Sequence, residues 1–310
     1  MGFYRLILFS CMDRKKSKKI RVVATHSGTF HADDVFAVSV LRLIYPNARV
    51  MRTRNTDELK KADIRIDVGG VYHFLTKDFD HHQRGGAGMR ENGIPYASAG
   101  LIWKHFGKRL VSSDEVFNQI DAKIIQYVDA DDVGFEGYTV EKLKPYTVSD
   151  FISGLNPHWP NVSSALFDSY FEEAVSIVVN LLKREIEGTE GIFKAKTLLR
   201  KKIKGSTGKY IVLDEYLPWK ETLVQESNLY YIVYRDPIEN NWLIMAVPVS
   251  LDSFENRKDL PKSWAGLVNE ALQKVTGVKD ATFCHNNLFC AVAKTKQGAI
   301  KLVELALKNG

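Results

Sequence analysis

In the N-terminal part of the chain, apolar and polar positions switch between the period of a strand and that of a helix. Short apolar or alternating runs predict strands at residues 20–25, 48–53 and 63–68. Helical spacing of apolar residues ahead of Pro46 predicts a helix over 34–45, and a short polar helix is expected at 56–61. Strands that alternate with helices in this way are typical of a parallel sheet with crossover helices, so we expect an α/β fold.

The rest of the chain predicts more helix and then a second group of strands. Helices are expected at 98–106, at 114–128 and at 163–187, the last with a break near Gly188 before it runs on to about 202. Further strands are expected at 210–214, 229–235, 242–249, 282–285 and 289–293, with helices at 264–275 and 297–307. The charged, Gly/Ser-containing stretch 201–208 predicts a domain boundary. We therefore expect a tail (1–19), an N-terminal domain (20–204) and a smaller α/β C-terminal domain (205–310).

Charge is concentrated in the tail. Residues 1–19 carry six basic side chains and one acidic one, so they account for five of the six net positive charges of the chain. The nearly neutral remainder gives little support for a basic nucleic-acid face. The tail is expected to be either a mitochondrial or nuclear address or a solvated, disordered arm.

Composition excludes several classes of protein. The longest apolar runs fall short of the ~18 residues of a membrane span, and no secretory signal is evident, so neither a membrane nor a secreted protein is expected. Three Cys without a CxxC pattern argue against a disulfide framework or a zinc ribbon, and for a reducing compartment.

Histidine and aspartate side chains gather at the ends of the predicted strands and of one helix. In chain order they are His26, His31, Asp33 and Asp34, then Asp67, then Asp80, His81 and His82, and finally Asp129, Asp131 and Asp132. Because the carboxyl ends of parallel strands line one crevice of an open α/β sheet, segments distant in sequence can converge there. Each residue also has a structural interpretation, as a helix cap, a solvated turn or a buried polar side chain.

Such a set of imidazoles and carboxylates suits Mn²⁺, Zn²⁺ or Fe, and suits Mg²⁺ less well. Its many carboxylates fit two divalent ions that share one aspartate, an arrangement that activates water against phosphoryl groups. Adjacent side chains in extended backbone point to opposite sides, so one of His81 and His82 can bind metal while the other meets substrate. Asp80 is expected to hold a ring N–H.

Eight strings of the sequence carry a resemblance to a known family. They are THSGTFHADD, DVGG, DFDHHQ, SAGLIW, VDADDVG, SGLNPHW, PWKE and FCHNNLF. Together they resemble the melanocyte-proliferating-gene family of DHH-like phosphoesterases, whose superfamily is named for the triplet Asp80-His81-His82. The resemblance implies a metal-dependent 3′–5′ exonuclease that acts on RNA by two-metal hydrolysis, associated with nucleus and mitochondrion. It also implies that residues 20–204 form a DHH-like catalytic domain and residues 205–310 a substrate-binding domain.

The resemblance assigns roles to individual residues. It implies metal ligation by His26, Asp33, His81 and Asp129, a metal-bridging role for Asp67 and a phosphate-binding role for His82. We expect Asp67, Asp80, His81 and His82 to be the catalytic residues. One position departs from the superfamily pattern: His31 stands where a ligand carboxylate is usual, shifted by one residue, and we count it among the candidate metal ligands. The expected cofactor is a pair of divalent ions, Mn²⁺ first, with Mg²⁺ or Zn²⁺ as alternatives.

On the substrate side, arginine suits bidentate contact with phosphate. Arg52, Arg54, Arg84 and Arg90 lie near the predicted crevice, and Arg54 and Arg84 are our candidates for binding single-stranded RNA or a short oligonucleotide. His285 is expected to face substrate or to be structural, and Trp219 and Trp242 to stack bases or to belong to the core. No stable protein partner is evident. Two other functions remain open: a phosphatase or pyrophosphatase for small phosphates, and a metal-bearing RNA-binding protein without catalysis.

Overall fold

The computed structural model describes residues 19–135 and 145–308. They divide into two compact units, one before and one after the boundary between Thr189 and Glu190. The division lies inside one helix, α7 (Ser164–Lys204), whereas the sequence predicted a boundary between residues 204 and 205. The predicted break near Gly188 is wrong, because α7 runs through it without interruption. The basic tail up to residue 18, on which the targeting hypothesis depends, lies outside the described residues.

The first unit contains a five-stranded, mostly parallel sheet. Its strands are β1 (Val22–Thr25), β2 (Arg49–Arg52), β3 (Ile64–Ile66), β4 (Tyr72–His73) and β5 (Asp78–Phe79), in the order β2-β1-β3-β5-β4. The pairings of β1 with β2 and β3, and of β3 with β5, are parallel, and only β4 is antiparallel to its neighbour. The three predicted strands and their parallel arrangement are confirmed. Strands β4 and β5, of two residues each, are too short to have a recognisable period.

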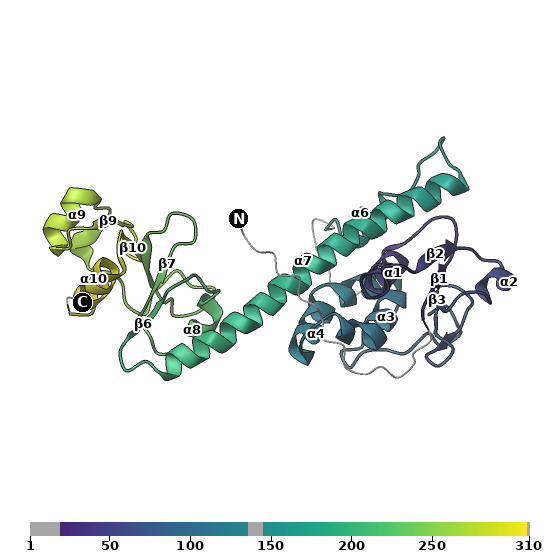
Figure 1. Cartoon of the computed structure of the whole chain (residues 1–310), viewed down its shortest axis with the longest axis horizontal. Coiled ribbons are helices and arrows are strands. Elements are labelled where there is room, and N and C mark those ends of the chain that lie inside the picture. The colour runs from purple at the N-terminus through teal and green to yellow at the C-terminus, as the bar shows by residue number, and fades with distance from the viewer. Residues whose placement is uncertain (1–18, 136–144, 309–310) are drawn as a thin grey trace. The chain divides into compact units, whose positions relative to one another are not determined.

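Helices cover this sheet on both faces. They are α1 (Ala32–Ile44), α2 (Thr56–Leu59), α3 (Ser98–Phe106), α4 (Asp114–Ile120), α5 (Gln126–Asp132) and α6 (Val148–Ser153). Figure 1 shows α1 and α3 on one side of strands β1–β3 and α2 on the other. Helix α1 is buried around most of its circumference, which explains its nearly continuous apolar sequence. The helix predicted over 114–128 is divided, because a π-helical segment, Asp121–Ile125, joins α4 to α5.

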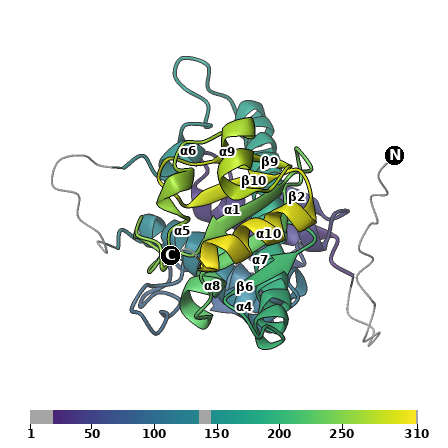
Figure 2. The same ribbon diagram turned by 90° about the vertical axis from the view of Figure 1, so that its left-hand side faces the viewer.

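The second unit contains another five-stranded sheet. Its strands are β6 (Tyr210–Leu213), β7 (Tyr231–Arg235), β8 (Trp242–Ala246), β9 (Ala281–Cys284) and β10 (Cys290–Ala293), in the order β6-β7-β8-β10-β9. Only the β6–β7 pairing is parallel. The helices are α8 (Lys220–Glu226), α9 (Asn269–Thr276) and α10 (Lys296–Lys308), and Figure 2 shows α10 in front of this sheet.

Alternation along β7 shows how this sheet is buried on both faces. Tyr231 and Val233 belong to the core beneath α9 and α10, whereas Ile232 and Tyr234 belong to the core that includes α8 and the end of α7. Trp219 lies in this second core, so its structural interpretation holds. Among the described helices, none combines the length and the apolar character needed to cross a bilayer.

Candidate metal centre

Three strand ends bring the first side chains together. His26 follows β1, Asp67 follows β3, and the triplet Asp80-His81-His82 follows β5. These strands are neighbours in the sheet and run parallel, so their carboxyl ends meet at one edge, as the sequence predicted. The backbone of Asp67 is in the left-handed region, with φ of 52°, a conformation that costs energy for a residue other than glycine and often occurs at functional sites.

Two helices complete the group. Helix α1 begins beside β1 and places Asp33 and Asp34, both fully buried, in its first turn. Helix α5 contributes Asp132 from its last position. Ser98, the first residue of helix α3, forms hydrogen bonds with two members of the group. Its backbone N–H donates to Asp33 Oδ2 over 3.3 Å, and its hydroxyl donates to Asp67 Oδ1 over 3.3 Å.

Asp67 lies between two sets of ligand atoms. Its Oδ2 is 3.2 Å from His26 Nε2, which is also 3.2 Å from Asp34 Oδ2. Its other oxygen, Oδ1, is 3.2 Å from His81 Nε2, which is 3.1 Å from Asp132 Oδ2 and 3.7 Å from Asp33 Oδ2. The two carboxylate oxygens of Asp67 therefore face different histidines, an arrangement that would allow one carboxylate to serve two neighbouring ions.

The candidate ligand atoms form three overlapping groups, within each of which all atoms lie within 4.8 Å of one another. The groups are His26 with His31 and Asp67, Asp67 with His81 and His82, and His31 with Asp33 and Asp132. His31 takes part in two of them, which places this residue among the ligand atoms despite its departure from the superfamily pattern. The described residues thus contain a His/Asp cluster that can hold a metal.

Asp80 orients His82 rather than joining the cluster. It is buried, accepts from the backbone N–H of Gly70 over 2.6 Å and from that of His82 over 3.0 Å, and lies 2.8 Å from His82 Nδ1. These contacts fix the ring of His82, whose side chain is 63 % exposed and faces the cavities described below. The predicted role of Asp80 as holder of a ring nitrogen fits this geometry.

The pKa values of the cluster follow from its crowded carboxylates. Burial opposes the charged form of His26, but Asp34 and Asp67 outweigh it and raise the pKa of His26 to about 10. Burial is likewise outweighed at His81, where Asp132 and Asp67 raise the pKa to about 10. Burial, together with repulsion from Asp67 and Asp132, holds the pKa of Asp33 well above its usual range. The cluster therefore has a surplus of buried carboxylate that cations would neutralise.

Unpartnered atoms support the fit of a metal. His26 Nε2, Asp33 Oδ1, Asp34 Oδ2 and His81 Nε2 are buried and make no hydrogen bond of ordinary geometry in the described part of the chain. Buried polar atoms are rarely left without hydrogen-bond partners. The four atoms here are imidazole nitrogens and carboxylate oxygens, which are common ligand atoms for divalent metals. The residues present therefore fit a metal centre.

Asp129 does not join the cluster. One of its oxygens accepts from Arg90 Nη1 over 2.7 Å and the other from the backbone N–H of Gly100 over 2.8 Å. Burial raises the pKa of Asp129 to about 7, against the opposing effect of Arg90. The predicted ligand role of Asp129 is thus not supported by its position, and Asp132, three residues further along α5, supplies the carboxylate beside His81 instead.

The four arginines considered for phosphate binding separate into different roles. Arg54 is exposed and lines a cavity with His26, His31 and Asp67, as expected of a phosphate ligand. Arg84 is exposed but lines none of the cavities described below. Arg52 is structural: it donates to the carbonyl of Gly28 over 2.6 Å and pairs with Asp168. Arg90 is engaged by Asp121 and Asp129.

His285 and Trp242 belong to the second unit. His285 packs against Phe289, with ring centroids 4.3 Å apart, and its Nδ1 accepts from the backbone N–H of Asn287 over 3.0 Å. Trp242 is partly buried against the core and lies beneath the ammonium group of Lys296. These contacts give both residues a local structural role, and the predicted contact of His285 with substrate stays a prediction.

Three cavities adjoin one another around the cluster. The first encloses about 350 Å³ and includes His26, His31, Arg54, Asp67 and His82 in its lining. The second encloses about 430 Å³ and shares His31 and His82 with the first. The third encloses about 500 Å³ and shares Asp131, Thr147 and Ser149 with the second. The cluster is thus bordered by a series of hollows within the first unit that share lining residues.

Sequence reasoning missed one residue that holds the site together. Asn156, in the string SGLNPHW, forms two hydrogen bonds with the backbone of Phe30, accepting from its N–H over 3.0 Å and donating to its carbonyl over 2.9 Å. Phe30 lies in the loop that carries His26 and His31. A single asparagine between a short helix and a proline gives no signal of such a contact, which joins segments distant in sequence.

Comparison with known proteins agrees with the sequence motifs. The model of the family MYG1_exonuc, described as uncharacterised protein family UPF0160, matches residues 22–307. A MYG1 protein of Saccharomyces cerevisiae is 31 % identical, over 94 % of this chain and 97 % of its own length. A human protein called MYG1 exonuclease is 30 % identical, over 92 % of this chain and 85 % of its own length. The resemblance inferred from the motifs is confirmed: this chain belongs to the MYG1 family.

Proposed function

We propose that this chain is a metal-dependent phosphodiesterase, and specifically a 3′–5′ exonuclease that hydrolyses single-stranded RNA or short oligonucleotides. The observation that carries the proposal is the position of Asp67, whose two oxygens face His26 and His81 on opposite sides. The names of the mammalian relatives, MYG1 exonuclease, support a nuclease. The preference for RNA and the 3′–5′ direction rest on the resemblance of the motifs to the family.

Two divalent ions sharing Asp67 would polarise a phosphoryl oxygen and make water a nucleophile at neutral pH. Mn²⁺ is our first candidate because imidazole and carboxylate ligands are mixed in the cluster. The residues of the chain position the substrate: Arg54 lines the same cavity as Asp67 and suits a phosphate oxygen. His82, held by Asp80, lines both cavities next to the cluster and suits a nonbridging oxygen of the same phosphate.

The test is hydrolysis of 5′-labelled RNA and DNA oligonucleotides and of pyrophosphate by the full-length protein, each with Mn²⁺ or with EDTA. We expect a ladder of products shortened from the 3′ end of RNA, in the presence of Mn²⁺ only. Release of phosphate from pyrophosphate alone would show a small-phosphate enzyme instead. No hydrolysis of any substrate, with Mn²⁺ bound, would point to an RNA-binding protein without catalysis.

Asp67→Asn is the decisive variant. It keeps the volume of the side chain but removes the charge that two ions would share, so we expect turnover to fall on the order of a thousandfold or more. In the absence of metal the carboxylate of Asp67 also pairs with His26 and His81, so the variant should melt at a lower temperature, and turnover is compared where circular dichroism shows that both proteins are folded. The matched control is Asp57→Asn, which alters an exposed aspartate of α2 that pairs only with Lys60 in the described structure. Retained turnover in Asp67→Asn would show that the bridging residue is wrongly assigned.

A further inference from the structure

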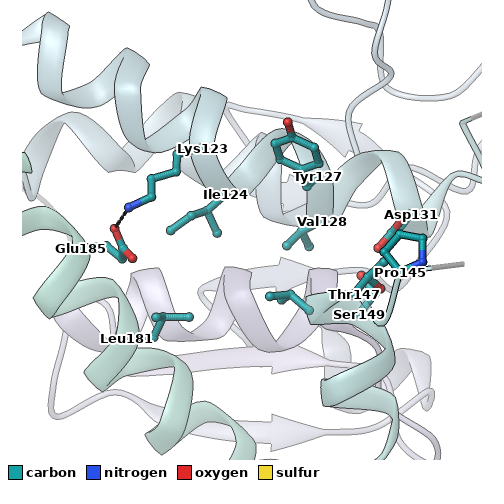
Figure 3. A pocket seen from close by; sticks show the side chains of 11 residues that line it. Lys123, Ile124, Tyr127, Val128, Asp131, Pro145, Thr147, Ser149, Leu181 and Glu185 are labelled. Atoms are coloured by element: carbon teal, nitrogen blue, oxygen red, sulfur yellow. Dashed lines mark hydrogen bonds and ion pairs between the residues drawn. The ribbon is translucent and has the colours of Figure 1, made fainter. Parts of the chain in front are cut away.

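The third cavity is apolar in its middle section. Figure 3 shows Ile124 and Val128, from the π-helical segment and α5, facing Leu181 of α7 across it. Tyr127, from the same stretch as Val128, is 59 % exposed and lies at its border. A cavity of about 500 Å³ with such walls has the size and lining of a site for a small organic ligand.

Its two ends differ in character. At one end, Lys123 and Glu185 form an ion pair of 2.5 Å, which closes the apolar section (Figure 3). At the other end lie Asp131, Thr147 and Ser149, which also line the cavity that contains His31, His82 and Asp132. A polar border therefore lies between the apolar section and the cavity beside the candidate metal centre.

One atom of this border needs a partner. Ser149 Oγ is buried and makes no hydrogen bond with any described residue. A buried hydroxyl without a partner is costly, and rotation of the Ser149 side chain about χ1 would turn this hydroxyl toward a ligand in the cavity. The cavity thus suits a molecule with a flat or bulky apolar part and a polar part beside Ser149.

From this arrangement we infer that the third cavity is a nucleobase-binding subsite, which receives the base of a nucleotide next to the scissile phosphate. The base stacks on Tyr127 against the aliphatic wall, and the sugar or a base edge accepts from or donates to Ser149. Stacking on an aromatic ring tolerates any base, so the subsite adds affinity with little sequence preference. The inference rests on the proposed function for the identity of the ligand.

Binding can be tested without catalysis. Adenosine, which has no phosphate to engage the metal centre, is added to the full-length protein in EDTA, and saturation-transfer NMR records contact with its base. We expect transfer to the base protons of adenosine and none to free ribose.

Three variants test the position of the base. Tyr127→Phe should keep this transfer, and Tyr127→Ala should weaken adenosine binding about tenfold. Leu181→Trp, which fills the cavity, should abolish the transfer. Tyr170→Ala, an exposed tyrosine of α7 outside the cavity, is the matched control.

The same variants separate this inference from the proposed function. With Mn²⁺, the wild-type protein should cleave RNA with a higher kcat/KM than the same oligonucleotide with abasic 3′-terminal nucleotides, and Tyr127→Ala should remove most of that difference. Equal kcat/KM on both substrates, together with no transfer to adenosine, would overturn the subsite while leaving the nuclease intact. Saturation transfer to adenosine that Leu181→Trp leaves unchanged would also overturn it. If Leu181→Trp abolishes the transfer in a protein that cleaves no oligonucleotide, the subsite is supported and the nuclease is refuted.

Discussion

At the scale of single residues, Asn156 lies outside the His/Asp cluster but holds the loop that carries His26 and His31. Its side chain satisfies both backbone groups of Phe30, and both residues are buried. Without it, a buried N–H and a buried carbonyl would lose their partners, and each such loss costs about 1–3 kcal/mol.

We therefore expect Asn156→Ala to lower the free energy of unfolding by about 2–4 kcal/mol and to weaken metal binding, because the loop of His26 and His31 loses its support. Urea denaturation followed by circular dichroism, and Mn²⁺ titration by calorimetry, measure the two effects. The control is His158→Ala in the same segment, an exposed residue whose Nε2 contacts only the carbonyl of Gly154 in the described structure. Unchanged metal affinity in Asn156→Ala would show that the loop is positioned by other contacts.

Some residues of the site could be predicted from the sequence and others could not. His26, His31, Asp33, Asp67 and His81 could be named because they follow strands or begin a helix, and strand ends converge by topology. The choice between Asp129 and Asp132 depends instead on the rotation of α5. The π-helical segment before α5 widens one turn and shifts the faces of the residues that follow, and no sequence pattern announces it.

Among the elements, α7 departs most from what its sequence suggests. The sequence predicted a break near Gly188, and glycine is a poor helix former. Nevertheless the helix continues on both sides, where buried residues such as Leu182, Ile186, Ala195 and Leu199 recur along it. Packing of these two sets of buried residues, one on each side of Gly188 in the sequence, outweighs the local preference, which is the usual result when the two compete. Four short elements were not predicted: β4, β5, α6 and α8. They are too short to show a repeating pattern of apolar residues, and their positions depend on contacts with the rest of the fold.

Substitution of the glycines in α7 should raise the free energy of unfolding, whereas most substitutions lower it. Among the described residues, and apart from the adjoining residues and the backbone of the helix itself, no atom lies within 4 Å of the Cβ that alanine would add at Gly188 or Gly191. Each Gly→Ala change should therefore raise the free energy of unfolding by about 0.5–1 kcal/mol, measured by urea denaturation. The contrasting control is Gly100→Ala in α3, where the new Cβ would lie 1.8 Å from Asp129 Oδ2 and should destabilise the protein. Loss of stability at Gly188 would mean that another group covers this face of the helix.

For the whole molecule, the division into two units limits how far metal binding can act. All candidate ligands and all three cavities beside them belong to residues 1–189. A ligand stabilises the states that bind it, so a metal protects only those segments whose opening would destroy its site. The sheet β6–β10 has its own two cores, on either face, within residues 190–310.

Hydrogen exchange of the full-length protein, read by mass spectrometry with Mn²⁺ or with EDTA, tests this separation. We expect Mn²⁺ to slow exchange severalfold in β1, β3, α1 and the segment after β5. Opening any of these segments would move one candidate metal ligand away from the others. Exchange in β7, β8 and β10 should stay the same in both conditions. Asp67→Asn should lose the effect of Mn²⁺ on the first unit while keeping the exchange pattern of the second. Equal protection of both sheets by Mn²⁺ would show that the two units unfold together, and the metal centre would then stabilise the chain as a whole.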